Sequence, residues 1–377
     1  ASQNEAGDRM ILIYPNVYKD FHCLAGACPD SCCRQGWQIP VDTAHQTLYE
    51  TLPGALGEAA RRTLVQDGEE AFLRMENGAC ALLREDGLCP LEAEYGADAL
   101  CDICRTHPRF IEVYGGRKEI HLSFSCPEAV RLALSQTKPV FLASEQTEEP
   151  VTEPFDADPE AFLALLEART QALRIAQDRR VFLPDRIALL LRFAARLQRL
   201  FDREEYALCK PLADRLLRAP YRDRTLAATL RLRLRGASYF PDLDLLRGTE
   251  HLTEDFPRLL NMTAFTRRES HPFWEAHTVE LENLLSLWLA HYLPKAVRDG
   301  DAQSRVLLAV FLTLAAVRLC VCSGEELAAV AALLAKELEH SEDNLAALCE
   351  AFARPGWTEH LTAQLPLPQE GEMPHAV

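Results

Sequence analysis

The chain has 377 residues, of which 48% are hydrophobic and 25% are charged. This composition is typical of a folded globular protein, and the length allows two or three domains. The formal net charge of −16 argues against nucleic acid as a partner, because phosphate binding needs a basic surface.

The sequence predicts neither a secretory signal nor a membrane span. Residues 1–9 are polar and lack the apolar core of a signal peptide. The most apolar stretch, Val306 to Val317, is shorter than a bilayer span and is followed by Arg318. We therefore expect a cytoplasmic protein without membrane insertion, whose cysteines stay reduced.

Residues 10–136 are predicted to form the first domain, a small cysteine-rich α+β region with short hairpins. Its opening, Phe21 to Gly36, contains the small and turn-forming residues that are typical of a loop. Val41 to Val65 then predicts one or two helices, with Asp42 or Thr43 as the N-cap.

Two glycine turns in this region, Asn77-Gly78 and Gly115-Gly116, each predict a β-hairpin. The runs that flank the turns are Ala71 to Met75, Cys80 to Arg84, Phe110 to Tyr114 and Lys118 to Leu122. Short strands and loops suit a metal site, because they bring ligands together from distant parts of the sequence.

The second half of the chain is predicted to be helical. Residues 137–159 are rich in Pro, Thr and Glu without apolar periodicity, which predicts a linker. Residues 160–377 follow as an α-helical domain, in which Ile187 to Phe201 and Leu281 to Tyr292 repeat apolar residues at spacings of three and four. The whole chain is therefore expected to be mainly α.

The 13 cysteines are unevenly distributed along the chain. Nine fall between residues 23 and 126, and such a dense group of reduced thiols indicates metal binding or redox activity rather than a disulfide framework. A free cysteine in a helix is usually a small core residue. That interpretation is given to the remaining four, Cys209, Cys320, Cys322 and Cys349.

The nine clustered cysteines are the candidate metal ligands: Cys23, Cys28, Cys32, Cys33, Cys80, Cys89, Cys101, Cys104 and Cys126. The pair Cys101-x2-Cys104 can place both sulfurs on one metal or cluster. Side chains of neighbours diverge, so Cys32 and Cys33 suit one tetrahedral ion poorly. They could reach two irons of a cluster, or one could bind metal while the other packs. This geometry favours an iron–sulfur cluster, with zinc as the alternative metal.

The number of metal sites stays open, because one cubane takes four thiolates and nine are present. Cys28, Cys32 and the Cys101–Cys104 pair are the strongest individual candidates. His107 is a candidate ligand or proton carrier, although a loop histidine is the commoner case. Its neighbours Arg105 and Arg109 could balance the charge of thiolates or meet a substrate carboxylate.

Several familiar catalytic motifs are missing from the sequence. The C-x3-C-x2-C pattern of radical S-adenosylmethionine enzymes begins at Cys28-x3-Cys32, but position 35 is Gln35. The sequence also lacks a P-loop, a dinucleotide-binding glycine motif and a hydrolase signature. Standard motifs therefore indicate neither a nucleotide cofactor nor a type of reaction.

The cysteine region resembles the bacterial flagellin lysine N-methylases over residues 12–130. The segments that carry the resemblance are Tyr14-Pro15, Phe21-His22-Cys23, Cys28, Ser31-Cys32-Cys33, Gly36-Trp37, Gly78 to Leu83, Gly87-Leu88-Cys89, Cys101 to Cys104, Pro108-Arg109 and Leu122 to Glu128. The same region is also similar to a broader family of zinc- or iron-chelating cysteine-cluster proteins. Many relatives have an aromatic residue where this chain has His107, so no role for His107 is taken from the resemblance.

The resemblance implies methyl transfer from S-adenosylmethionine to surface lysines of flagellin, with a [4Fe–4S] cluster on these cysteines. A polar route needs an acceptor for the lysine proton. Tyr14, Tyr18 and Glu128 are candidates by their nearness in sequence to the cysteines. A radical route would use the cluster to reduce the sulfonium. Two alternatives from other classes are a non-catalytic iron–sulfur or redox-sensing module and a zinc-stabilised scaffold.

Overall fold

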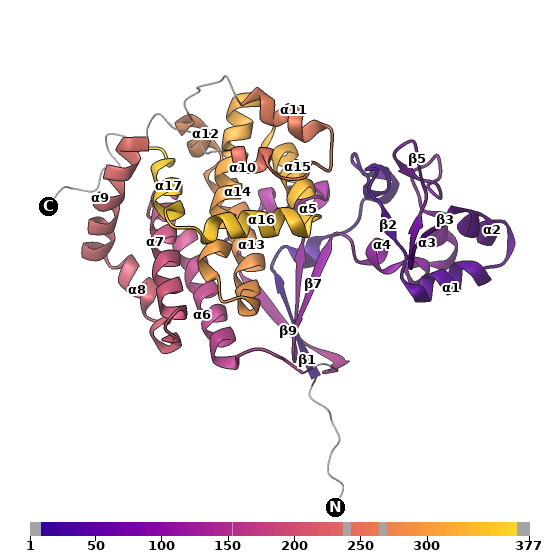
Figure 1. Cartoon of the computed structure of the whole chain (residues 1–377), viewed down its shortest axis with the longest axis horizontal. Coiled ribbons are helices and arrows are strands. Elements are labelled where there is room, and N and C mark those ends of the chain that lie inside the picture. The colour runs from indigo at the N-terminus through magenta and orange to yellow at the C-terminus, as the bar shows by residue number, and fades with distance from the viewer. Residues whose placement is uncertain (1–8, 153, 237–242, 264–269, 368–377) are drawn as a thin grey trace, which may run out of the picture.

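The computed structural model describes residues 9–152, 154–236, 243–263 and 270–367 (Figure 1). Helices dominate these residues, which confirms the predicted mainly α fold. Residues 1–8, on which the expectation of a missing signal peptide rests, lie outside the described residues.

The chain folds around two separate hydrophobic cores. One core contains Ile39, Tyr49, Leu73 and their neighbours, all between residues 33 and 104. The other core is far larger and is built mostly by the helices after residue 159. We call residues 22–107 the cysteine lobe and the remaining described residues the helical body. Figure 1 shows the lobe beside the body, with strands β1, β7 and β9 near the junction.

The boundary between these units differs from the predicted division at residues 10–136. Strand β1 (Arg9–Pro15) pairs in parallel with β8 (Arg117–Leu122), which forms a hairpin with β7 (Arg109–Tyr114). All three strands belong to the four-stranded sheet of the body. The lobe is therefore an insertion between β1 and β7. A pairing between strands about a hundred residues apart leaves no local pattern in the sequence.

The segment predicted as a linker, residues 137–159, contains strand β9 (Leu142–Pro150). This strand pairs antiparallel with β1, with Ile13 opposite Ser144, and forms one edge of the sheet β7-β8-β1-β9. Its side chains are polar and largely exposed, as edge strands commonly are. Residues 142–150 therefore lack apolar periodicity because they form an exposed edge strand, and the prediction of a linker was wrong for this part of the segment.

The cysteine lobe contains two of the predicted helices, α1 (Thr43–Thr51) and α2 (Gly54–Thr63), and Asp42 is the N-cap of α1 as predicted. In the first predicted hairpin only Met75–Glu76 (β5) pairs with Ala79–Cys80 (β6). Its upstream part, β4 (Glu70–Leu73), joins a separate sheet with the two strands β2 (Ile39–Pro40) and β3 (Leu64–Asp67). The lobe is completed by the short helices α3 (Pro90–Tyr95) and α4 (Asp102–Thr106).

The helical body is centred on α14 (Ala302–Ser323), which packs against α7, α13 and α16. The other helices of the body are α5 (Pro127–Ser135), α6 (Pro159–Ala176), α7 (Leu183–Phe201), α8 (Leu212–Leu217), α9 (Ala219–Gly236), α10 (Asp244–Arg247), α11 (Asp255–Met262), α12 (His271–Ala276), α13 (Thr278–Tyr292), α15 (Leu327–Glu339), α16 (Glu342–Ala353) and α17 (Trp357–Ala363). The helices predicted at 187–201 and 281–292 correspond to α7 and α13.

Helix α14 is long and apolar enough to cross a membrane, and it is the one such helix found in the described residues. Most of it is covered by other helices, since 89% of its most apolar window is buried inside the protein. This burial agrees with the predicted core helix. Of the four cysteines predicted to be core residues, Cys209, Cys320 and Cys322 are buried and Cys349 is half-buried, although Cys209 lies in a turn before α8 rather than in a helix.

Candidate metal centre

All nine candidate ligands are free thiols, and they come from both units of the fold. Eight lie in the cysteine lobe, whereas Cys126 is the N-cap residue of α5 in the helical body. Five of the lobe thiols pack within the lobe core, and we call them the core set: Cys33, Cys80, Cys89, Cys101 and Cys104. The other four lie outside that core, and we call them the seam set: Cys23, Cys28, Cys32 and Cys126.

Local structure fixes the core set at the ends of short elements. Cys89 and Cys101 precede the first residues of α3 and α4, and Cys80 ends the strand β6. The fully buried Tyr49 on α1 accepts the backbone N–H of Cys101 on its hydroxyl at 3.0 Å and donates to the carbonyl of Ala99 at 3.0 Å. A buried phenol thereby holds the start of α4 against α1.

Asp42 links the same two helices from the outside. Its carboxylate accepts the backbone N–H of Asp102 at 3.0 Å and the ring Nδ1 of His45 at 2.8 Å. Asp42, His45 and Asp102 are the only trio of metal-binding side chains in the described residues whose donor atoms all lie within 4.8 Å of one another. Because Asp42 is already occupied as a helix cap and as a partner of His45, we assign this trio a structural role.

The spacing expected between ligand sulfurs differs between a tetrahedral zinc site and an iron–sulfur cluster. Four thiolates on one tetrahedral zinc lie about 3.8 Å apart, given a Zn–S distance of about 2.3 Å. Among the described cysteines, no three sulfurs lie within 4.8 Å of one another. In an iron–sulfur cubane each thiolate binds a different iron, so the ligand sulfurs are spaced more widely.

A hydrogen bond between two thiols lowers the pKa of one and raises the pKa of the other. A hydrogen bond from Cys32 lowers the pKa of Cys33 to about 7, and the same bond raises the pKa of Cys32. The Cys104 thiol similarly lowers the pKa of Cys101 to about 7. Burial raises the pKa of Cys80 to about 11. Because metals bind thiolates, filling these sites releases protons from the thiols that burial keeps neutral.

The lobe meets the body along a contact that we call the seam, formed by Asp30, Trp37 and His107 from the lobe and by Lys336 and His340 from the body. Lys336 of α15 forms an ion pair with Asp30. The ring of His340 lies 4.7 Å from Trp37 and 5.7 Å from His107, measured between ring centres. The Trp37 indole donates to the carbonyl of Cys32 at 2.9 Å. The seam therefore lies directly beside the cysteines.

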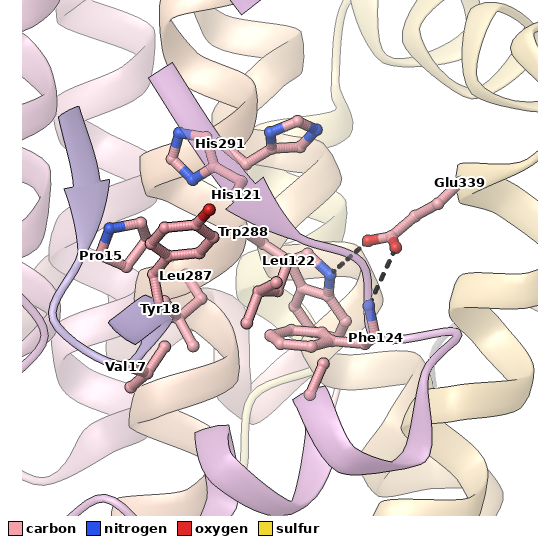
Figure 2. Close-up of a pocket in the computed structure, with 11 residues that line it drawn as sticks. Pro15, Val17, Tyr18, His121, Leu122, Phe124, Leu287, Trp288, His291 and Glu339 are labelled. Atoms are coloured by element: carbon pink, nitrogen blue, oxygen red, sulfur yellow. Dashed lines mark hydrogen bonds between the residues drawn. The ribbon is translucent and has the colours of Figure 1, made fainter. Parts of the chain in front are cut away.

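Behind the seam, the body encloses a small pocket (Figure 2). Its cavity volume is about 20 Å³, room for about one water molecule. Figure 2 shows Glu339 at one side, with hydrogen bonds to the Trp288 indole at 3.3 Å and to the backbone N–H of Phe124 at 3.2 Å. The pocket is otherwise lined by apolar and aromatic groups together with His121 and His291.

Glu339 is half-buried, and its removal from water raises its pKa to about 7. It connects to the seam through three successive hydrogen bonds. The Ser123 hydroxyl donates to Glu339 at 2.5 Å, Ser123 and Ser125 lie 2.8 Å apart, and the Ser125 hydroxyl lies 2.8 Å from Nε2 of His340. A carboxyl group that titrates near neutral pH is thus joined by hydroxyl groups to a histidine in the seam.

The pocket histidines are held neutral. His121 and His291 are fully buried, and burial lowers the pKa of each. Burial also lowers the pKa of His107 in the seam to about 4. Beside His121 the buried pair Glu119–Arg169, at 2.6 Å, joins strand β8 to helix α6. Charge in this region therefore resides on the ion pair and, near neutral pH, on Glu339.

The residues predicted as proton acceptors lie in different places. Tyr18 lines the pocket, whereas the Tyr14 hydroxyl donates to Glu145 at 3.0 Å and Glu128 pairs with Arg131 on α5. Of the two arginines beside His107, Arg105 pairs with Asp102, and the guanidinium of Arg109 lies 5.1 Å from the ring centre of Phe21.

Sequence reasoning missed Glu339 and His340. They follow a regular amphipathic helix, Leu327 to Leu338, and nothing in that pattern separates them from surface residues. The only sequence feature that could have pointed to them is a glutamate followed by a histidine at the end of an apolar helix.

Three curated Salmonella proteins are similar to the chain. The flagellar biosynthetic protein FliU of Salmonella muenchen is 30% identical over 144 residues, which cover 35% of this chain and 82% of FliU. Two proteins named Lysine-N-methylase, from Salmonella choleraesuis strain SC-B67 and Salmonella typhimurium strain LT2, are each 32% identical over 145 residues. The chain belongs to the flagellin lysine N-methylase family.

Membership of the flagellin lysine N-methylase family confirms the resemblance noted from the cysteine segments. The match covers 35% of this chain but only 34% of the length of the two lysine-N-methylases. No protein-family model and no solved structure matches the chain significantly.

Proposed function

We propose that this protein is a lysine N-methyltransferase acting on flagellin, with S-adenosylmethionine as donor and a [4Fe–4S] cluster bound by its cysteines. The observation that carries the proposal is the 32% identity to two proteins named Lysine-N-methylase. The flagellar name of the third relative, FliU, supports a flagellar protein as the substrate.

The donor set supports the cluster. Nine thiols in or beside one lobe supply more than the four thiolates that a cubane takes. Their sulfurs are spaced more widely than a tetrahedral zinc site needs. When bound, such a cluster would supply iron for holding polar groups of the donor or electrons for reducing it.

The hydrogen-bonded chain behind the seam supports a polar route. In this route the lysine nitrogen forms a bond to the methyl carbon, and the bond from that carbon to the donor sulfur breaks. The lysine must first lose a proton, and its ordinary pKa is about 10.4. In this proposal the lysine proton passes to His340 and then along the hydroxyl groups of Ser125 and Ser123. Its final acceptor is Glu339, whose pKa of about 7 suits this role.

The test is methyl transfer by protein purified without oxygen. Purified flagellin and S-adenosylmethionine labelled in its methyl group are added, and the label on lysine is measured. We expect labelled flagellin, and none when its lysines are acetylated beforehand. The variant Cys101→Ser should lose activity, whereas Cys209→Ser, in the helical body, should keep it.

Three outcomes would contradict this proposal. Absence of affinity for S-adenosylmethionine would favour a non-catalytic redox module. Tightly held zinc without sulfide would favour a structural scaffold. A requirement for a strong reductant, with release of 5′-deoxyadenosine, would replace the polar route by a radical one.

A further inference from the structure

Helices α7 and α9 border a groove whose charged side chains are all arginines. Its cavity volume is about 330 Å³, which falls within the range of small-molecule sites. Arg192, Arg196 and Arg199 line it from α7, and Tyr221 and Arg224 line it from α9. In the part of the chain that the structure describes, no acidic side chain lines this groove. We call it the arginine groove.

The sequence spacing of both helices explains the groove. The three arginines of α7 recur at positions i, i+4 and i+7, and the lining residues of α9, from Tyr221 to Ala228, recur at i, i+3, i+4 and i+7. Residues at these spacings share one face of a helix. The short side chains of Ala195 and Ala228 also line the groove, and they leave space between the longer ones.

The positive charge of this region is a local feature of an acidic protein. Residues 183–236 contain 13 Lys or Arg and 6 Asp or Glu, a net charge of +7, whereas the whole chain carries −16. Guanidinium groups that share one groove repel one another. A bound anion would offset this repulsion, so the groove is suited to a negatively charged ligand.

The contacts of the α7 arginines use few of their N–H groups. The guanidinium of Arg196 lies 4.9 Å from the ring centre of Tyr221, which is a cation–π contact. Arg199 donates Nε–H to the carbonyl of Ala195 at 3.1 Å, and this is one of its five N–H donors. Arg192 lies 3.8 Å from Glu359 of α17, a partly exposed pair of the kind that contributes little.

Phosphate groups match this set of donors. An arginine can bind a phosphate through two parallel N–H bonds. A phosphate monoester carries a charge of about −1.5 to −2 at neutral pH, so two phosphate groups bring enough charge to offset four guanidinium groups. The sulfonium of S-adenosylmethionine is positive, and the groove therefore does not suit the proposed methyl donor.

We propose that the arginine groove binds a small molecule that carries at least two phosphate groups. The concave shape favours a small ligand over the extended surface of a nucleic acid or a membrane. Figure 1 shows α9 at the side of the helical body away from the cysteine lobe, so this site is separate from the candidate metal centre. The inference does not depend on methyl transfer.

The test is isothermal titration of whole protein with inorganic pyrophosphate, the simplest probe of this chemistry. We expect one pyrophosphate per chain and weaker binding as salt is raised. Arg196→Gln/Arg224→Gln should weaken binding by about tenfold or more, since each tenfold step equals about 1.4 kcal/mol. The matched control Arg258→Gln/Arg354→Gln removes the same charge at two exposed positions outside the groove and should bind as the unaltered protein does.

Equal binding by the groove variant and its control would overturn the site. Any pyrophosphate held by metal is common to both variants and cancels in this comparison. Citrate binding as tight as that of pyrophosphate would overturn the assignment to phosphate. Binding of single-stranded RNA or anionic vesicles through the same arginines, without binding of pyrophosphate, would replace the small ligand by a macromolecule.

A second variant guards against a loss of folding. Arg199→Gln changes an exposed side chain and should also weaken pyrophosphate binding, while far-UV circular dichroism shows an unchanged helical signal. The methyl-transfer assay is a separate measurement. Pyrophosphate binding without transferase activity would refute only the proposed function, and transferase activity without pyrophosphate binding would refute only the arginine groove.

Discussion

Glu339 shows how several hydrogen-bond donors can hold a half-buried carboxyl group in place. Four groups donate to it: the hydroxyls of Ser123 and Tyr292, the indole of Trp288 and a backbone N–H. Burial nevertheless dominates and raises its pKa to about 7. The folded state therefore holds a proton on Glu339 at a pH where an unfolded chain would release it.

Stability should consequently fall as pH rises through neutrality. A raised folded pKa contributes stability fully below the unfolded pKa of about 4.3, and this contribution is lost as pH rises through about 7. We expect Glu339→Gln to remove up to about 3 kcal/mol of this decline between pH 5 and 8. Urea unfolding at pH 5 and at pH 8 measures this change in the free energy of unfolding. Glu350→Gln, an exposed control in α16, should keep the slope, and an unchanged slope in Glu339→Gln would contradict the assignment.

At the scale of elements, the sequence predicted what local patterns determine. Helices α7 and α13, the cap at Asp42 and the β7–β8 hairpin all follow from periodicity or turn residues. Strand β9 was missed because an edge strand with polar side chains has no apolar period. The nine thiols were recognisable from spacing, whereas Glu339 and His340 join the site only through the packing of α15 against the lobe.

Helix α6 is attached to the sheet by a buried charge pair, which gives a second prediction. Arg169 and Glu119 are almost wholly buried, and the salt bridge is 2.6 Å long. Arg169→Met would leave Glu119 with weaker compensation inside the protein, at a cost of about 3 kcal/mol in unfolding free energy. Arg298→Met, which breaks an exposed pair with Glu112 on the same sheet, should cost less than about 1 kcal/mol. Equal losses in denaturant titrations would show that burial does not decide the effect.

At the scale of the whole molecule, the two cores differ in what supports them. The body has a large apolar core centred on α14, whereas the lobe core is small and contains five cysteines. Small domains with limited cores commonly depend on a metal for stability. The stability of the lobe should therefore depend on the proposed metal centre, whereas that of the body should not.

Removal of metal should unfold the lobe selectively. Trp37 is the one tryptophan in the lobe, and the other three lie in the body. After chelation we expect limited proteolysis to cut within residues 22–107 while the far-UV helical signal persists. In a variant with Trp274, Trp288 and Trp357 replaced by Phe, the Trp37 emission should shift to the red. Loss of the helical signal together with the lobe would indicate one cooperative unit.

The insertion of the lobe between β1 and β7 also sets an order of events during synthesis. Domains emerge from the ribosome N-terminal first. All residues of the lobe core have been made by Cys104, whereas β1 waits for β8 and for β9, which ends at Pro150. Until then β1 is an unpaired apolar edge that invites aggregation. The lobe core can thus be complete while β1 still lacks both of its neighbouring strands.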